Sequence, residues 1–175
     1  MKTPPLLPEE TLHRVLRVAN IDGLSVLLIA GVLALAAAAA GDYAGAAIGL
    51  LVAAAGAIEL HGAGLVRAGE RRGMQWLVAS QPYLLLVLLG YCLLWLTNVD
   101  QALLRLMKNL FHFVYGSNFR GMLAEAGYEE PRFYRMIYRL VFLSLAFTTV
   151  IYQGGMTVYY LRRRGAVKAA LGEAE

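Results

Sequence analysis

The residues best suited to chemistry are an acid and an imidazole, Glu59 and His61, near the end of a long apolar run. A carboxyl group can carry a proton or bind a cation, and an imidazole changes its charge near neutral pH. An ionisable side chain inside a membrane helix is costly, so it marks a candidate functional site. This pair therefore indicates a site that could bind or transfer protons, cations or small solutes.

Other polar residues fall at a similar depth in the apolar runs. At 1.5 Å per helical residue, they lie within about 6–12 Å of the surface at the charged ends of the runs. The predicted layer contains Glu59, Gln81, Gln153 and Ser25, with His61, Ser80 and Thr157 near the same level. Pro82 and Gly154-Gly155 add helix irregularities there, which is typical of helices that line cavities. These polar residues are the candidate pore or ligand-binding set.

Two interpretations of this layer remain open. Polar side chains between membrane helices often bond only one another, and each such bond stabilises packing by about 0.6 kcal/mol. Glu59 could also be protonated, pair with His61 or Arg67, or extend toward the surface. The layer is therefore either a binding or conducting site or a set of helix-pairing contacts.

The sequence offers no pattern for metal binding or catalysis. Glu59 and His61 are two positions apart, whereas ligands on one helix face are three or four apart. The single cysteine, Cys92, lies in an apolar run and gives neither a metal motif nor an internal disulfide. No nucleophile stands beside a base, and there is no glycine-rich phosphate loop, because most of the glycines lie in apolar runs. We therefore expect no metal, no cofactor and no enzymatic activity.

Composition indicates a membrane protein. Apolar residues make up 59% of the 175 residues and charged residues 16%, against about 45–50% and about 25% in soluble proteins. The net charge of +4 comes from basic residues that lie beside apolar runs. Lipid headgroups and topology explain that placement better than nucleic acid does. The predicted partner is the lipid bilayer, with no nucleic acid.

The apolar runs predict an all-α integral membrane protein of one domain with four transmembrane helices. The expected spans cover residues 21–40, 44–66, 74–97 and 138–161, each long enough to cross about 30 Å of hydrocarbon. Small residues spaced four apart predict close packing of the first two spans, with each other or with a second copy. The two stripes are Ala30, Ala34 and Ala38, and Gly45, Gly49, Ala53 and Ala57.

Interfacial amphipathic helices are expected at the N-terminus, over about residues 8–19, and in the long loop, over about 100–115. A short helix over residues 117–126, ended by Gly127, is expected to follow the second. The last helix should open at Glu130-Pro131 and run to about Arg164, with a frayed polar tail from Gly165.

Basic residues set the expected orientation. Arg67, Arg71 and Arg72 follow the second span, Arg162–Arg164 follow the last, and the short turn at Gly41–Tyr43 has no basic residue. The positive-inside rule then places both termini in the cytoplasm, in a plasma or inner membrane. The remaining basic residues lie in the long loop or at the start of the last helix.

The leading hypothesis is a channel or transporter-like protein whose Glu59, Gln81 and Gln153 layer passes or binds a proton, cation or small solute. A bundle this small has little room for its own solute path, so we expect a homo-oligomer or a subunit of a larger membrane complex. The alternative is a non-catalytic membrane scaffold or accessory subunit, in which the layer only specifies helix pairing. A lipid-modifying enzyme is the least favoured class.

Overall fold

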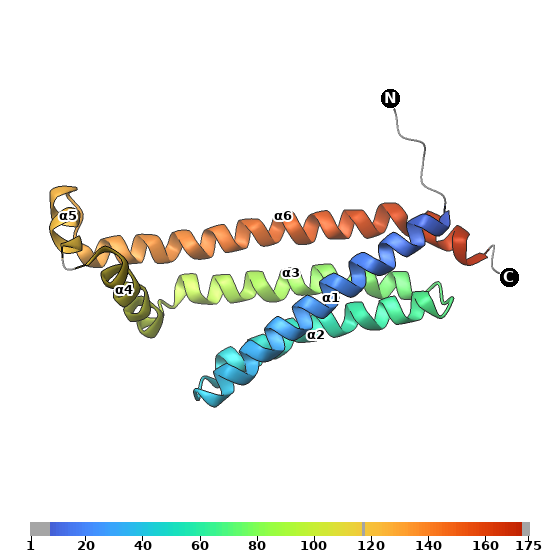
Figure 1. The fold of residues 1–175 in the computed structure, drawn as a ribbon, viewed down its shortest axis with the longest axis horizontal. Helices are drawn as coiled ribbons and strands as arrows, with labels where there is room; N and C mark the ends of the chain where they lie inside the picture. The colour runs from blue at the N-terminus through green and yellow to red at the C-terminus, as the bar shows by residue number, and fades with distance from the viewer. Residues whose placement is uncertain (1–7, 117, 173–175) are drawn as a thin grey trace, which may run out of the picture. The chain divides into compact units, whose positions relative to one another are not determined.

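The computed structural model describes residues 8–116 and 118–172, and this part of the chain is all-helical. Helix accounts for 90% of it, and no strand occurs among the described residues. The helices follow one another as α1 (Pro8–Ala39), α2 (Tyr43–Arg67), α3 (Gly73–Thr97), α4 (Gln101–Tyr115), α5 (Phe119–Glu125) and α6 (Glu130–Gly172) (Figure 1). The predicted all-α class is confirmed.

Within the described residues, four helices are long and apolar enough to cross a membrane: α1, α2, α3 and α6. They contain 32, 25, 25 and 43 residues. The number and order of the long apolar helices thus agree with the sequence analysis. Their insertion into a membrane stays a prediction, as does the orientation of the termini.

Local sequence explains where several of these helices begin and end. Asp42 caps α2 by accepting a hydrogen bond from the Gly45 backbone N–H at 2.8 Å, and Asp100 caps α4 by accepting one from Ala102 at 2.7 Å. Gly41, between α1 and α2, has a φ of 78°, a left-handed conformation that glycine adopts without steric cost. These residues make tight turns between long helices.

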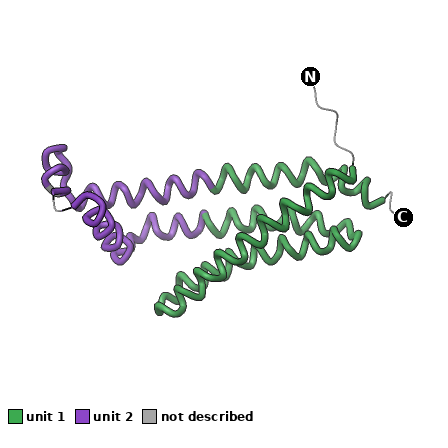
Figure 2. Tube along the Cα trace, viewed as in Figure 1, with its two compact units in different colours: residues 1–88, 149–175 green, residues 89–148 purple. Residues whose placement is uncertain are grey.

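The chain forms two compact units, Met1–Leu88 with Thr149–Glu175 and Leu89–Thr148 (Figure 2). Unit 1 contains α1, α2, the first part of α3 and the last part of α6. Unit 2 contains the end of α3, α4, α5 and the first part of α6. All the residues that the sequence placed in the polar layer belong to unit 1.

Small residues bring α1 and α2 of unit 1 into backbone contact. A Cβ added to Gly56 would lie 2.5 Å from the Gly23 carbonyl oxygen and 2.7 Å from the Leu27 nitrogen. One added to Gly49 would lie 2.8 Å from the Ala34 Cβ. The two stripes therefore pack against each other within one chain.

The contact line along α2 differs in detail from the predicted stripe. Ala57 and Ala38 are exposed, whereas Gly56 and Ala46 belong to the contact. A strict four-residue spacing drifts around a helix of 3.6 residues per turn, so a straight contact alternates steps of three and four. Ala46, Gly49, Ala53 and Gly56 follow that alternation.

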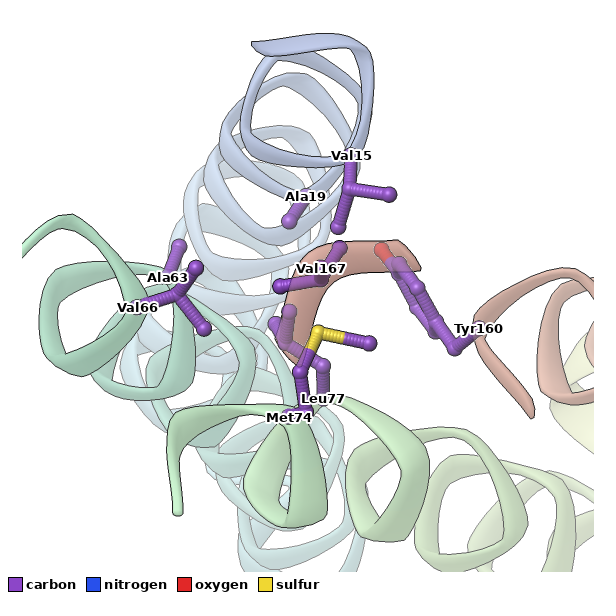
Figure 3. Packing of buried hydrophobic residues seen from close by; sticks show 8 residues of the cluster. All are labelled: Val15, Ala19, Ala63, Val66, Met74, Leu77, Tyr160 and Val167. Atoms are coloured by element: carbon purple, nitrogen blue, oxygen red, sulfur yellow. The ribbon is translucent and has the colours of Figure 1, made fainter. Parts of the chain in front are cut away.

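Four helices meet in the apolar core of unit 1 (Figure 3). The core residues are Val15 and Ala19 of α1, Ala63 and Val66 of α2, Met74 and Leu77 of α3, and Tyr160 and Val167 of α6. This core fixes the position of the Tyr160 side chain, which is fully buried.

Two segments at the ends of the chain differ from expectation. The amphipathic segment over residues 8–19 is not a separate helix, because α1 runs unbroken through Asn20, whose side chain donates to the Leu16 carbonyl at 2.7 Å. The tail is helical rather than frayed from Gly165 to Gly172, where α6 ends, and Val167 is fully buried; residues 173–175 lie outside the described residues. In both segments, apolar residues at helical spacing pack into the four-helix core.

Unit 2 has its own apolar core around Tyr138. The Tyr138 hydroxyl donates to the Trp95 carbonyl at 3.0 Å and accepts from the Asp100 N–H at 3.3 Å. Cys92 is buried in the same cluster, as a packing residue would be. The predicted helix over residues 117–126 is α5, which begins at Phe119; Ser117 lies outside the described residues.

The segment predicted as an amphipathic helix over about residues 100–115 is helical as α4, and its apolar residues lie on two different surfaces. Leu103 and Met107 pack onto the core around Tyr138, whereas Leu106, Leu110 and Val114 are exposed. Its location at a membrane interface stays a prediction.

Gly56→Ala should destabilise the protein by about 1–3 kcal/mol, because the new methyl group overlaps the backbone of α1. Gly64→Ala is the matched control on the same helix, since nothing lies within 4 Å of a Cβ at Gly64. Thermal unfolding of both variants in detergent micelles measures the difference. Equal unfolding midpoints for the two variants would contradict the close α1–α2 contact.

Candidate functional site

The centre of the candidate site is Glu59, a carboxyl group on α2 that is only 2% exposed. The hydroxyl of Tyr160, on α6, donates a hydrogen bond to Glu59 Oε1 at 2.5 Å. Tyr160 is held by the four-helix core, so its hydroxyl is fixed relative to the carboxyl group. Two helices far apart in the sequence thus contribute to one buried polar contact.

A second acid, Asp22 on α1, is close enough to Glu59 to interact directly with its carboxyl group. Its neighbour Gly23 permits this approach, because a Cβ on Gly23 would lie 3.3 Å from the Glu59 Cβ. The Tyr152 hydroxyl donates to Asp22 Oδ1 at 2.8 Å, while Asp22 Oδ2 is buried without a partner among the described residues. Two carboxyl groups and two tyrosine hydroxyls therefore form one cluster.

Amide and hydroxyl side chains of α3 complete this cluster. Gln81 is fully buried and interacts with Glu59. Its Nε2 donates weakly to Ser80 Oγ at 3.4 Å, and Ser80 Oγ donates to the Leu77 carbonyl at 3.0 Å. Gln81 Oε1 has no hydrogen-bond partner in the described part of the chain. We call Glu59, Asp22, Gln81, Tyr152 and Tyr160 the acid cluster.

Gln153 and Thr157 lie next to the acid cluster along α6. Gln153 is buried, and its Oε1 has no partner within the residues that the structure describes. The Thr157 hydroxyl is used locally, since it donates to the Gln153 backbone carbonyl at 2.8 Å. Neither side chain makes a recorded bond to Glu59.

Two predicted layer residues point elsewhere. His61 is exposed and packs edge-on against Trp76, with ring centroids 5.5 Å apart. Two positions on an α-helix are separated by about 200°, which directs His61 away from Glu59. Ser25 on α1 is also exposed. The buried layer is therefore smaller than the sequence suggested.

Sequence reasoning missed Asp22, Tyr152 and Tyr160. Asp22 carries a usable signal, because it is an acid at the start of the first apolar run, about one helical turn before Ser25. In the predicted span of residues 21–40 Asp22 is the second residue, a position at the membrane surface where an acid is common. Tyr160 carries no comparable signal, because a tyrosine next to arginines at the end of an apolar run is typical of a membrane interface. Only the structure places its hydroxyl on Glu59.

Among the described residues, no basic side chain forms a recorded ion pair with the acid cluster. The ion pairs recorded between described residues use other acids, namely Glu70, Glu129 and Glu130. No group of three or more His, Cys, Asp or Glu side chains suited to a metal ion occurs in the described part of the chain. Two adjacent carboxyl groups in apolar surroundings repel when both are ionised, so a proton or a cation bound between them relieves this repulsion.

No protein-family model, curated protein or solved structure matches this chain.

Tyr160→Phe should lower the free energy of unfolding by about 1–2 kcal/mol, because it leaves the buried Glu59 carboxyl without its hydroxyl donor. Tyr159→Phe is the matched control, since the Tyr159 hydroxyl has no partner among the described residues. Denaturant unfolding in micelles compares the two variants. A Tyr159→Phe effect as large as that of Tyr160→Phe would contradict the assigned hydrogen bond.

Proposed function

We propose that this protein is a membrane-embedded proton-handling protein, a channel or transporter component, in which the acid cluster takes up and releases a proton. The observation that carries the proposal is the adjacency of Asp22 and Glu59 at the close α1–α2 contact, where no ion pair to either acid is recorded among the described residues. Carboxyl groups inside membrane helices are costly and mark ion pathways and proton relays.

Burial favours a proton over a hydrated cation or a larger solute. Glu59 is 2% exposed and Gln81 is fully buried, so a hydrated ion would have to separate the helices. A proton needs only neighbouring groups that both donate and accept hydrogen bonds. Hydroxyl groups and protonated carboxyl groups have that property.

A route from the surface of unit 1 to Glu59 supports the proposal. Tyr152 is 50% exposed and donates to Asp22. Asp22 interacts with Glu59, which is bonded to Tyr160. In the proposal, Asp22 exchanges protons with the surface of unit 1 at Tyr152, and Glu59 holds the proton. Tyr160 and Gln81 keep the Glu59 carboxyl group in place.

The proposal includes the membrane setting. The four long apolar helices would cross a plasma or inner membrane with both termini in the cytoplasm, following the positive-inside rule. A second copy or another membrane subunit would complete the path beyond the acid cluster.

Proton flux in proteoliposomes tests this function. Wild-type protein should dissipate an imposed pH gradient faster than empty liposomes, and Glu59→Gln should reduce that flux to the background because an amide cannot release a proton. Asp22→Asn should reduce the flux about tenfold or more by removing the exchange step. A pH-sensitive dye inside the vesicles reports the rate.

Glu70→Gln is the matched control, because Glu70 lies in the loop after α2 and pairs with Arg72. It should conduct like the wild type. Flux that is equal in wild type and Glu59→Gln, or no flux above empty liposomes from folded protein, would overturn the proposal.

The burial of the cluster also favours a second candidate, a membrane scaffold or accessory subunit whose polar cluster only specifies helix pairing. Glu59, Gln81 and Ser80 are each at most 2% exposed. For a scaffold, all variants would show background flux, while Glu59→Leu would weaken assembly of the chain in micelles and Glu59→Gln would not.

A further inference from the structure

Several basic residues of the long loop and the start of α6 have no role in the acid cluster or in the expected orientation. Arg105 and Lys108 of α4 and Arg135 of α6 line one open groove of unit 2, which also contains Glu130. Because these cations come from two helices and meet at one groove, they form a candidate anion site.

The two arginines are held in a way that leaves their guanidinium ends available. Arg105 Nε donates to the Gln101 carbonyl at 3.2 Å, and Arg135 Nε donates to the Pro131 carbonyl at 3.2 Å. Each guanidinium is therefore anchored to its own helix through Nε. The terminal N–H groups can still form the two-pronged hydrogen bonds that suit a phosphate.

The acid in the groove is already compensated. Glu130 Oε1 forms an ion pair with Lys108 at 2.9 Å and lies 3.7 Å from His112 Nε2. Within the described residues, no ion pair is recorded for Arg105 or Arg135. The groove thus retains two positive charges that an anion can neutralise.

The surface next to the groove is apolar. A second open pocket on α6 shares Arg135 and adds Arg139, Leu140 and Leu143. Leu140 and Leu143 are 55% and 58% exposed, one to two turns further along the helix. Charged residues followed by exposed leucines match the order of groups in a phospholipid, a phosphate followed by an acyl chain.

We propose that this groove of unit 2 binds the phosphate of an anionic phospholipid, with Arg105 and Arg135 as its ligands and the leucines of α6 against an acyl chain. A free phosphate ion offers the same charge but leaves the exposed leucines uncovered. An acidic protein segment is less suited, because the exposed leucines belong to α6, a helix long and apolar enough to cross a membrane.

Native mass spectrometry of the intact protein in detergent tests the proposal with two lipid probes, dioleoylphosphatidylglycerol and dioleoylphosphatidylcholine. The wild type should retain the anionic lipid in preference to the zwitterionic one. Arg105→Gln with Arg135→Gln should weaken phosphatidylglycerol binding about tenfold, since two charged contacts are lost. Arg67→Gln with Arg162→Gln is the control, because it removes the same charge from exposed residues outside the groove.

Arg105→Lys with Arg135→Lys keeps the charge and guards against misfolding of the glutamine variant. It should bind phosphatidylglycerol more weakly than the wild type and more tightly than the glutamine variant. Equal binding of the two lipids, or equal losses in the groove variant and the control, would overturn the site. Displacement of the lipid by millimolar inorganic phosphate would identify free phosphate as the ligand and overturn the lipid assignment.

Discussion

The burial of one carboxyl group, that of Glu59, is the constraint on which unit 1 depends. A carboxyl group removed from water is costly unless hydrogen bonds replace its hydration. Tyr160 supplies one such bond, and Gln81 interacts with the same group. Both partners come from other helices, so α2, α3 and α6 must keep a fixed register around Glu59. The apolar core that contains Tyr160 and Val167 provides that register.

The acid cluster also requires the close contact between α1 and α2. Gly23 and Gly56 let the two backbones meet, and the same contact brings Asp22 beside Glu59. Helix pairing through small residues and the pairing of two acids are therefore one structural feature. A larger residue at Gly23 or Gly56 would separate the helices and the acids together. This coupling makes the packing of α1 and α2 a determinant of the proposed proton site.

Much of the fold could be predicted from the sequence, because long apolar runs with capping residues determine helices locally. Glu59 and Gln81 were found in the same way, as polar residues in apolar runs. The partners of Glu59 could not be predicted, because rotation about each helix axis decides which side chains meet. His61, two residues from Glu59, faces outward, while Tyr160, 101 residues away, donates to it. The packing of the end of α6 could not be predicted, because the many charged residues of this segment indicate an exposed tail. Only one strongly apolar residue among these described residues, Val167, is fully buried.

The proposed function requires that the Glu59 carboxyl group exchanges its proton with the surroundings. Infrared difference spectroscopy of wild type and Glu59→Gln in lipid tests this directly by isolating the carbonyl stretch of a protonated Glu59. We expect a band that is absent in Glu59→Gln and that shifts within minutes in deuterated buffer, if Asp22 and Tyr152 relay the exchange as proposed. A band that persists unshifted for hours would mean a sealed, purely structural carboxyl group and would contradict proton exchange at Glu59.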